Sequence, residues 1–262
     1  MVQDTWSSGA AYDGYIGRWS RPVAERFVPW LEPRPDTTWI DVGCGSGALT
    51  ETILGAARPS RVIGVDPSAD FVEHAQSAIE DDRSEFVVGD GGALPAASEF
   101  ADHVVSGLVL NFIADPDAAL AEMSRVATAG ATIAAYVWDY AEGMQMLRSF
   151  WDAVIALDPG AASLDESTRF PLCRPESLRR LFDAAGLSDV ETSDITVDTT
   201  FTDFDDYWTP FLSGQGPAPG YCSSLAPADL GRLRDRLRDG LAPDGGPIDL
   251  TARAWAVKGI RA

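Results

Sequence analysis

The chain has 262 residues, of which 45% are hydrophobic and 10% aromatic, a composition typical of a globular protein with a sizeable core. Its 40 acidic and 20 basic side chains give a net charge of −20, which disfavours nucleic acid and anionic membranes as partners. Three widely spaced cysteines and two histidines predict neither a disulfide scaffold nor a metal site.

The opening residues MVQDTWSSGA lack the pattern of a signal peptide. No stretch approaches the ~20 apolar residues that span a bilayer. We therefore expect a cytoplasmic protein.

Five β-branched runs alternate with helical patterns between Thr38 and Trp138. The expected strands are TWIDV (38–42), RVIGVD (61–66), EFVVGD (85–90), ADHVVSGLVL (101–110) and ATIAAYVW (131–138). With two later strands, this order predicts a Rossmann-like, doubly wound α/β fold with seven mostly parallel strands.

Local signals mark the ends of the helices in this region. Ser46 and Ser68 are expected to cap the first two helices, and Asp115 with Pro116 begins a third. Gly130 is expected to end that third helix.

Beyond Trp138 the chain predicts a helix at 143–157, another at 175–185 ended by Gly186, and strands near 190–201 and 250–260. About 47 residues separate these last strands, far more than the ~2–5 of a hairpin loop. We interpret the chain as one domain with an N-terminal helical cover, a core and two helical insertions that cover a substrate. Their ranges are 1–37, 38–139, 140–170 and 202–248, with helices expected at 203–212 and 226–241.

The stretch WIDVGCGSGA places Asp41 before a turn with three glycines. Read loosely, this turn and Asp66 match a dinucleotide fingerprint. A diphosphate would meet Asp41 with a repulsion of ~4 kcal/mol at ~4 Å and an effective dielectric of ~20, whereas an ammonium group would be attracted. No Lys follows the glycines, so a P-loop is also excluded.

WIDVGCGSGA, VIGVDPS and VVGDGGALP together resemble motifs I, II and III of class I S-adenosylmethionine-dependent methyltransferases over Thr38–Trp138. The resemblance implies S-adenosylmethionine as cofactor and S-adenosylhomocysteine as product. It places Asp41 near the amino group of the cofactor, Asp66 at the ribose hydroxyls and Asp90 at the adenine amino group. The segment Leu108–Phe112 resembles the stretch that lines the methionine and transfer site.

The N-terminal YDGYIGRWS resembles the opening of one bacterial branch of small-molecule methyltransferases, which implies that Tyr12 and Arg18 lie at the carboxylate end of the cofactor. The implied cofactor-binding set is Tyr12, Arg18, Asp41, Gly43, Cys44, Gly45, Gly47, Asp66, Pro67, Asp90, Gly91, Leu108, Asn111 and Phe112. The Gly91-Gly92 pair departs from the alanine common there, which leaves adenine packing less defined. No D/N-P-P-Y/F/W motif follows the fourth strand, so methylation of nucleic-acid bases is disfavoured.

Each of these residues also has a purely structural interpretation. The glycines can simply shape a turn, and Asp66 and Asp90 can cap strand ends. His103, at the start of the fourth strand, is expected to be structural.

Five aromatic residues between Thr202 and Cys222 suggest an apolar lid over the substrate. The residues expected to bind substrate are Trp138, Tyr207, Trp208 and Phe211. Aromatic residues at helical spacing, such as Phe150 and Trp151, are more often core.

The expected reaction is in-line transfer of a methyl group to a small apolar or aromatic metabolite of specialised metabolism. Positioning supplies most of such catalysis, so a general base is optional. The candidate catalytic residues are Asn111, Asp139 and Tyr140, although Asp139 can equally cap the next helix. Two alternatives stay open: a protein that uses the same cofactor for non-methylating chemistry or sensing, and an NAD-dependent oxidoreductase.

Overall fold

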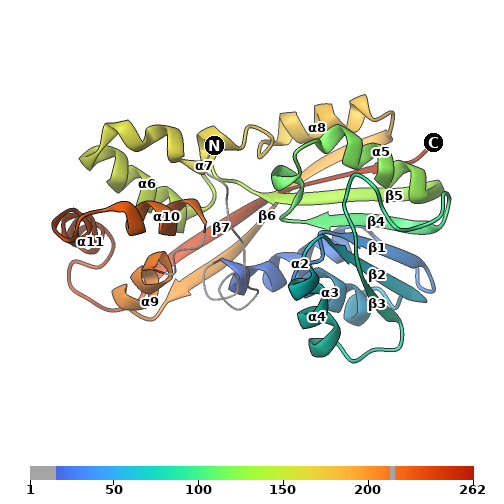
Figure 1. Ribbon diagram of the computed structural model, residues 1–262, viewed down its shortest axis with the longest axis horizontal. Coiled ribbons are helices and arrows are strands. Elements are labelled where there is room, and N and C mark those ends of the chain that lie inside the picture. The colour runs from blue at the N-terminus through green and yellow to red at the C-terminus, as the bar shows by residue number, and fades with distance from the viewer. Residues whose placement is uncertain (1–15, 213–215) are drawn as a thin grey trace. The chain divides into compact units, whose positions relative to one another are not determined.

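The computed structural model describes residues 16–212 and 216–262 (Figure 1). Where the sequence predicts one domain, the chain divides into two compact units. The sheet unit comprises Ser20–Val137, Leu172–Ile195 and Ala254–Ala262. The helical unit comprises, among the described residues, Ile16–Trp19, Trp138–Pro171 and those between Thr196 and Arg253. Both predicted insertions thus fall in the helical unit.

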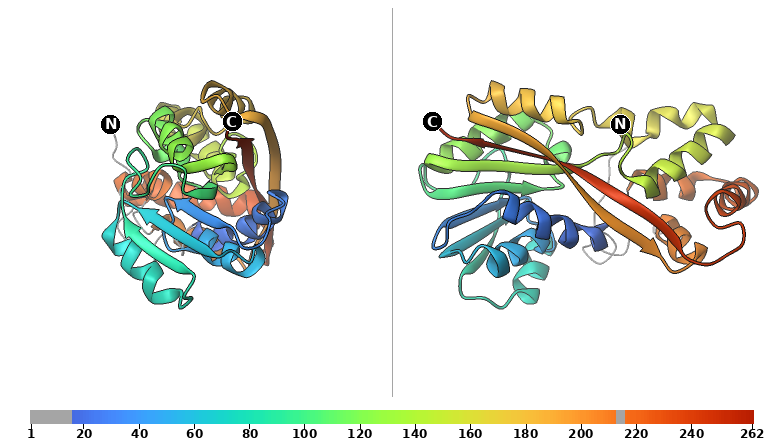
Figure 2. Two further views of the ribbon diagram at one scale, coloured as in Figure 1. Left: turned by 90° about the vertical axis from the view of Figure 1, so that its right-hand side faces the viewer. Right: turned by 180° about the vertical axis from the view of Figure 1, so that it is seen from behind.

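A seven-stranded sheet in the order β3-β2-β1-β4-β5-β7-β6 confirms the predicted fold class. Its strands are β1 (Thr38–Val42), β2 (Arg61–Asp66), β3 (Ser84–Val88), β4 (Ala101–Gly107), β5 (Ala127–Trp138), β6 (Ser188–Phe201) and β7 (Ile248–Ile260). Strands β1–β5 pair in parallel. The chain order reverses between β1 and β4, the position at which α/β sheets bind ligands. The long strands β6 and β7 lie side by side (Figure 2).

Backbone hydrogen bonds show that β7 runs antiparallel to β5. The N–H of Gly130 donates to the carbonyl of Arg261, and the N–H of Asp139 donates to that of Arg253. From the first of these pairs to the second, the residue number rises in β5 and falls in β7. The two strands therefore run in opposite directions.

Helices of the sheet unit are α2 (Ser20–Trp30), α3 (Ala48–Ala56), α4 (Ala69–Ala78), α5 (Pro116–Val126) and α8 (Pro175–Ala184), with a 3₁₀ turn η2 (Leu110–Phe112). Two predicted caps are confirmed: Ser68 accepts from the Phe71 N–H, and Asp115 accepts from the Ala118 N–H. The predicted Ser46 cap is wrong, because α3 begins after Gly47, whose φ of 89° ends the turn.

Gly130 was also misassigned as a helix stop, since α5 ends at Val126 and Gly130 lies inside β5. Between Ala101 and His103 the register of β4 jumps from Ala127 to Thr132, so β5 carries extra residues there. Gly130 takes a φ of 78° within this irregularity, a conformation that favours glycine.

His103 is part of the core, as expected. Its imidazole stacks on the indole of Trp39 with ring centroids 4.0 Å apart. Burial lowers the pKa of His103 to about 4, so the ring is neutral at physiological pH.

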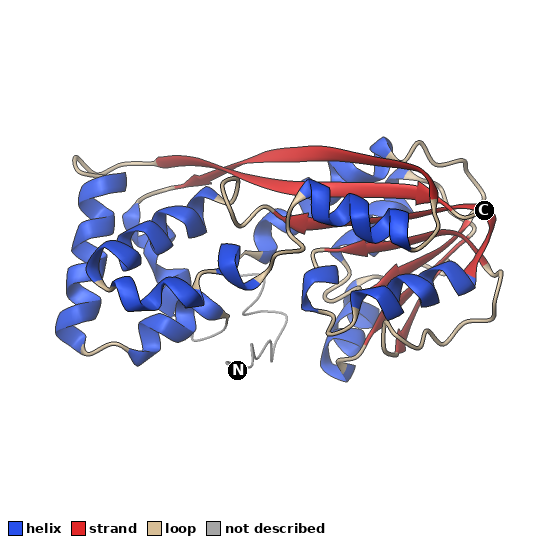
Figure 3. Ribbon diagram, turned by 90° about the horizontal axis from the view of Figure 1, so that it is seen from above, coloured by secondary structure: helices blue, strands red, loops and turns tan. Residues whose placement is uncertain are grey.

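The helical unit is built mainly of helices (Figure 3). They are η1 (Gly17–Trp19), α6 (Gln145–Leu157), η3 (Pro159–Leu164), α7 (Glu166–Arg169), α9 (Phe204–Trp208), η4 (Thr209–Leu212), α10 (Pro217–Ser224) and α11 (Pro227–Leu241). The helices predicted in both insertions are therefore confirmed. No helix in the described part of the chain has the length and apolar character needed to cross a membrane.

Candidate functional site

The glycine turn between β1 and α3 adopts a backbone that requires glycine. Gly43, Gly45 and Gly47 have φ values of 76°, 51° and 89°. A Cβ atom on Gly43 would lie 2.5 Å from Val109 Cγ1, so any side chain there would displace the loop after β4. A Cβ on Gly45 would meet nothing within 4 Å, so that backbone stays open to a ligand.

Asp41 is fully buried at the carboxyl end of β1. Its Oδ2 accepts a hydrogen bond of 2.8 Å from the Thr50 hydroxyl, whereas its Oδ1 has no partner among the described residues. Burial raises the pKa of Asp41 to about 7, the Thr50 hydrogen bond lowers it, and the negative charge of Asp66 raises it further. A cationic hydrogen-bond donor would relieve this buried, half-satisfied carboxyl group.

Asp66 ends β2 and holds the glycine turn. Its Oδ2 accepts from the Gly45 N–H at 3.0 Å, and its Oδ1 accepts from the Ser68 N–H at 2.9 Å. Burial raises the pKa of Asp66, and these two backbone bonds oppose the rise. A carboxylate has about four lone-pair sites, so Asp66 keeps acceptor capacity for two further donors.

A cavity of about 370 Å³ opens beside the turn, within the usual range of about 300–1,000 Å³ for small-molecule sites. Its lining includes Gly43, Pro67, Asp90, Val109 and Phe112. Asp90 is exposed, and its Oδ1 accepts from the Gly92 N–H at 2.7 Å. The structure therefore gathers residues from the ends of β1, β2, β3 and β4 around one cavity.

The side chain of Cys44 is a packing group of the hydrophobic core. It is buried in a cluster with Val72, Ala75 and Phe86. Burial raises the pKa of its thiol, so the sulfur is an unreactive packing group. Only the backbone of Cys44 can serve the cofactor-binding role predicted for this residue.

The loop after β4 contains two features that sequence reasoning did not find. Leu108 has a φ of 62°, which is rare for a residue with a side chain and ends the strand three residues early. The side-chain amide of Asn111 has neither a donor nor an acceptor partner among the described residues, and both of its polar atoms are shielded from solvent. The Thr50 hydroxyl on Asp41 was also missed, because a helix residue facing a strand leaves no sequence motif.

Asp139 is engaged on both oxygens and is a poor candidate for a general base. Its Oδ2 pairs with the Arg253 guanidinium, with Nε at 2.8 Å, and its Oδ1 accepts from the N–H groups of Ala141 and Glu142 at 3.1 and 3.2 Å. The side chain is buried. The structure thus supports the alternative that Asp139 stabilises the turn after β5.

Tyr140 and Trp138 flank Asp139 and are also buried. The Tyr140 ring lies 5.6 Å from that of Phe170, and its carbonyl accepts from Arg148. The indole Nε1 of Trp138 is buried without a partner in the described ranges. Among the described residues Trp138 thus has an N–H donor without an acceptor, whereas Tyr140 is integrated into the packing of the helical unit.

The aromatic residues predicted as a lid form the core of the helical unit. Tyr207 and Phe211 are completely buried, and Trp208 is nearly so. Phe211 stacks on Phe150 with centroids 4.4 Å apart, and the Tyr207 hydroxyl donates to the Met146 carbonyl at 3.0 Å. These contacts join the two insertions, so the rings of Tyr207, Trp208 and Phe211 do not offer a free surface to a substrate.

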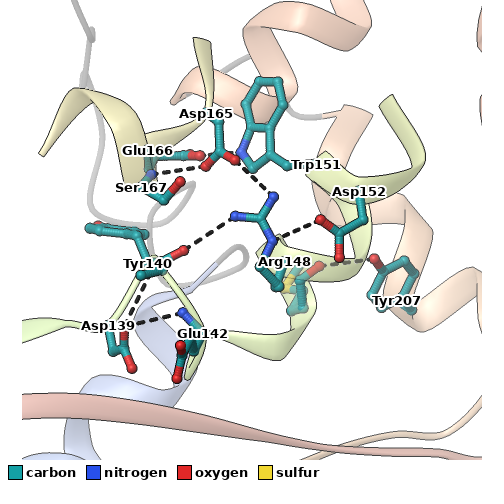
Figure 4. A network of polar contacts seen from close by, with 12 residues as sticks. Asp139, Tyr140, Glu142, Arg148, Trp151, Asp152, Asp165, Glu166, Ser167 and Tyr207 are labelled. Atoms are coloured by element: carbon teal, nitrogen blue, oxygen red, sulfur yellow. Dashed lines mark hydrogen bonds and ion pairs between the residues drawn. The ribbon is translucent and has the colours of Figure 1, made fainter. Parts of the chain in front are cut away.

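An ionic network reinforces the same unit (Figure 4). Arg148 pairs with Asp152 at 3.0 Å and with Asp165 at 2.7 Å. Beside it, the buried Glu166 accepts a hydrogen bond from the Trp151 indole. Burial raises the pKa of Glu166 to about 8.

Arg18 is already neutralised within the helical unit. Its Nη1 pairs with Asp206 Oδ1 at 3.0 Å, and its guanidinium lies over the rings of Trp19 and Phe201. Tyr12, the other residue predicted at the carboxylate end of the cofactor, lies outside the described residues. In the described parts of the chain, no three His, Cys, Asp or Glu side chains are placed to hold a metal ion.

Comparison with known sequences gives a consistent set of similarities. A sequence profile described as a methyltransferase domain matches residues 40–135. Demethylmenaquinone methyltransferase of Roseiflexus sp. (strain RS-1) is 32% identical over 166 residues, which cover 58% of this chain and 68% of that enzyme. Malonyl-[acyl-carrier protein] O-methyltransferase of Hahella chejuensis is 30% identical over 129 residues, 49% of this chain and 46% of that enzyme.

Solved structures share the fold. Phosphoethanolamine N-methyltransferase 2 of Haemonchus contortus, in complex with S-adenosyl-L-methionine, superposes with a TM-score of 0.55 and 14% identity. The match covers 93% of this chain and 52% of that one. At this identity the likeness concerns the architecture and not the acceptor.

Proposed function

The chain belongs to the class I S-adenosylmethionine-dependent methyltransferases, and we propose that it methylates a small apolar or aromatic metabolite. The relatives named above act on different acceptors, so the family alone does not choose one. The net charge of −20 argues against nucleic acid and other polyanionic acceptors. The buried Trp138 indole at the end of β5 adds an aromatic group whose Nε1–H has no partner in the described part of the chain.

Cofactor binding through the glycine turn is supported chiefly by Asp41. Its Oδ1 has no donor among the residues that the structure describes, and a positively charged ammonium supplies one, whereas the diphosphate of a dinucleotide would be repelled. In the proposed arrangement Asp66 accepts from the ribose hydroxyls with its remaining lone pairs. Asp90 and Phe112 serve the adenine from the cavity wall.

The proposed chemistry needs little from acid–base groups. Bound S-adenosylmethionine supplies an electrophilic methyl group on a sulfonium, whose departure as a thioether requires no proton. Orienting the acceptor contributes ~7–11 kcal/mol, whereas a general base contributes only ~3–5 kcal/mol. The engagement of Asp139 with Arg253 is consistent with a reaction in which positioning dominates.

Calorimetry with S-adenosylmethionine and S-adenosylhomocysteine tests the cofactor assignment. The wild-type protein should bind both in the micromolar range, and Asp66→Ala should lose about tenfold or more, since it removes charged hydrogen-bond acceptors. Asp82→Asn, an exposed carboxylate away from the cavity, is the matched control. Absence of binding to the wild type would refute the assignment.

Transfer of a labelled methyl group into a metabolite extract tests the reaction itself. Label should appear in small organic-soluble compounds. Label in RNA, DNA or protein would contradict the proposed acceptor class. Tight cofactor binding with no label in any fraction would instead favour non-methylating use of the pocket.

A further inference from the structure

We propose that the sheet unit carries a second small-molecule site, which binds a small zwitterionic α-amino acid at the amino end of β4. The site is a cavity of about 170 Å³ whose lining includes Arg34, Asp102 and His103. The cofactor cavity lies at the other end of the same strand, because its lining residues Val109 and Phe112 follow β4. The second site is therefore separate from the cofactor and goes beyond the proposed function.

An irregularity in β5 forms one wall of this cavity. The step from Ala101 to His103 in β4 corresponds to the step from Ala127 to Thr132 in β5, so β5 carries extra residues there. Residues 128–132 line the cavity. The extra backbone thus forms a wall beside His103 instead of a continuous ladder.

The segment that follows α2 forms another wall. Its exposed residues Glu32 and Arg34 line the cavity. Pro33 and Pro35 flank Arg34 and restrict the backbone on both sides. The Arg34 carbonyl also accepts a hydrogen bond of 3.0 Å from the Thr37 hydroxyl. A short, rigid segment therefore carries the guanidinium at the cavity.

His103 contributes a polar group without a partner. The residue is only 7% exposed, and its Nδ1 has no hydrogen-bond partner among the described residues. Buried polar groups almost always have such a partner, so an unpaired one indicates a ligand. A neutral imidazole has one donor and one acceptor nitrogen and can pair with either kind of ligand atom. Because Nδ1 is shielded from solvent, the lining must shift when a ligand pairs with it.

The charges around His103 favour a zwitterion. Burial is the main cause of the low pKa of His103, the negative charge of Asp102 raises that pKa, and the positive charge of Arg34 lowers it, so both charges act on the ring. Asp102 Oδ2 accepts from the Thr38 N–H at 2.9 Å, which leaves lone pairs of the carboxylate for a ligand. Glu32 adds a second carboxylate. A simple anion would be repelled by the carboxylates and a simple cation by Arg34, whereas an amino acid offers an ammonium group to the former and a carboxylate to the latter.

The volume limits the size of the ligand. A water molecule occupies about 30 Å³ in the liquid, so 170 Å³ corresponds to about six waters. Glycine, L-alanine and L-serine contain about five to seven non-hydrogen atoms and match this size. Drug-sized ligands and nucleotides need the larger cavities of about 300–1,000 Å³.

Nuclear magnetic resonance of the two histidine side chains tests the proposal. Protein with ¹³C-labelled histidine is titrated with glycine, L-alanine and L-serine, with L-alaninamide, which lacks the carboxylate, and with N-acetyl-L-alanine, which lacks the ammonium group. The amino acids should shift the imidazole signals of His103 with a Kd on the order of 1 mM, and either analogue should bind about tenfold or more weakly. His74, which is exposed on α4 and outside the lining, should not respond. Saturating S-adenosylhomocysteine should leave the response of His103 in place.

Two substitutions assign the charges. Arg34→Met should remove the preference for L-alanine over L-alaninamide, because it deletes the partner of the carboxylate. Asp102→Asn should remove the preference for L-alanine over N-acetyl-L-alanine, while its amide oxygen still accepts from the Thr38 N–H. Arg180→Met removes an exposed arginine of α8 outside the lining and should retain both preferences. A purely structural role of Arg34 or Asp102 would change neither preference.

Four results would each overturn the inference. They are the absence of any response of His103 at ~10 mM amino acid, equal binding of the amino acids and both analogues, loss of the response with S-adenosylhomocysteine bound, and unchanged preferences in Arg34→Met and Asp102→Asn. The third result would place the amino acid in the cofactor cavity. Because no step needs methyl transfer, failure of the proposed function would leave this test intact.

Discussion

Replacing Asp41 with Asn should stabilise the ligand-free protein at alkaline pH and weaken cofactor binding. The substitution keeps the shape of the side chain and an oxygen that can accept from Thr50. It removes a negative charge that is fully buried and places an N–H donor where Oδ1 has no partner within residues 16–212 and 216–262. The same change therefore acts in opposite directions on folding and on binding.

The size of the folding effect follows from the pKa. Asp41 titrates near 3.8 when unperturbed and at about 7 in the folded chain, a rise of about 3 units. Because the folded pKa is raised, the contribution of Asp41 to stability is complete below pH 4 and is lost as the pH rises through 7. At about 1.4 kcal/mol per unit, the loss is up to about 4 kcal/mol by pH 8. Asn does not titrate, so the variant avoids this loss.

Urea unfolding at pH 4.5 and pH 8, without ligand, measures the effect. Wild type and Asp41→Asn should differ far less at pH 4.5 than at pH 8, where the variant should be the more stable. Glu166 also has a raised pKa, but it is present in both proteins and cancels in the difference. Asp82→Asn should follow the wild type at both pH values.

Binding supplies the second half of the test. In the wild type, ligand affinity should increase as the pH rises towards 8, because the ammonium group favours the ionised carboxylate. In Asp41→Asn this dependence should vanish, and affinity at pH 8 should fall by a hundredfold or more, on the order of the ~4 kcal/mol of a close ion pair. A variant that is no more stable than the wild type at pH 8, or that binds equally well, would refute this reasoning.

Three further substitutions have clear expected outcomes. Glu166→Gln should raise the free energy of unfolding above pH 8 and change little at pH 4, because burial holds the pKa of Glu166 at about 8; an unchanged pH profile in urea would contradict this. Gly43→Ala should lower the free energy of unfolding by about 1–3 kcal/mol and reduce cofactor affinity, since the φ of 76° and the contact with Val109 oppose a side chain. A calorimetric affinity equal to that of the wild type would count against this prediction. Asp139→Asn should lower the Tm by breaking the pair with Arg253, yet leave methyl transfer per folded molecule within about tenfold; a loss of ~10²–10⁴-fold with an intact fold would restore Asp139 as a general base.

The sequence alone determined the features that are local in the chain. Alternating β-branched runs located the strands of the sheet, and Ser68 and Asp115 marked helix starts, because these signals depend on neighbouring residues. The glycine turn with Asp41 and Asp66 was equally visible. Parallel strands bring their carboxyl ends to one edge, so motifs far apart in sequence could be assigned to one site.

Tertiary structure decided the partners of these side chains. Arg253 lies 114 residues from Asp139, and Asp206 lies 188 residues from Arg18, so neither ion pair leaves a local pattern. These pairs engage Asp139, which the sequence offered as a general base, and Arg18, which it placed at the carboxylate end of the cofactor. Which polar atoms find partners depends on how distant segments pack, and only the folded chain shows that Asp41 and Asn111, at the carboxyl edge of the sheet, keep atoms without a hydrogen-bond partner among the described residues.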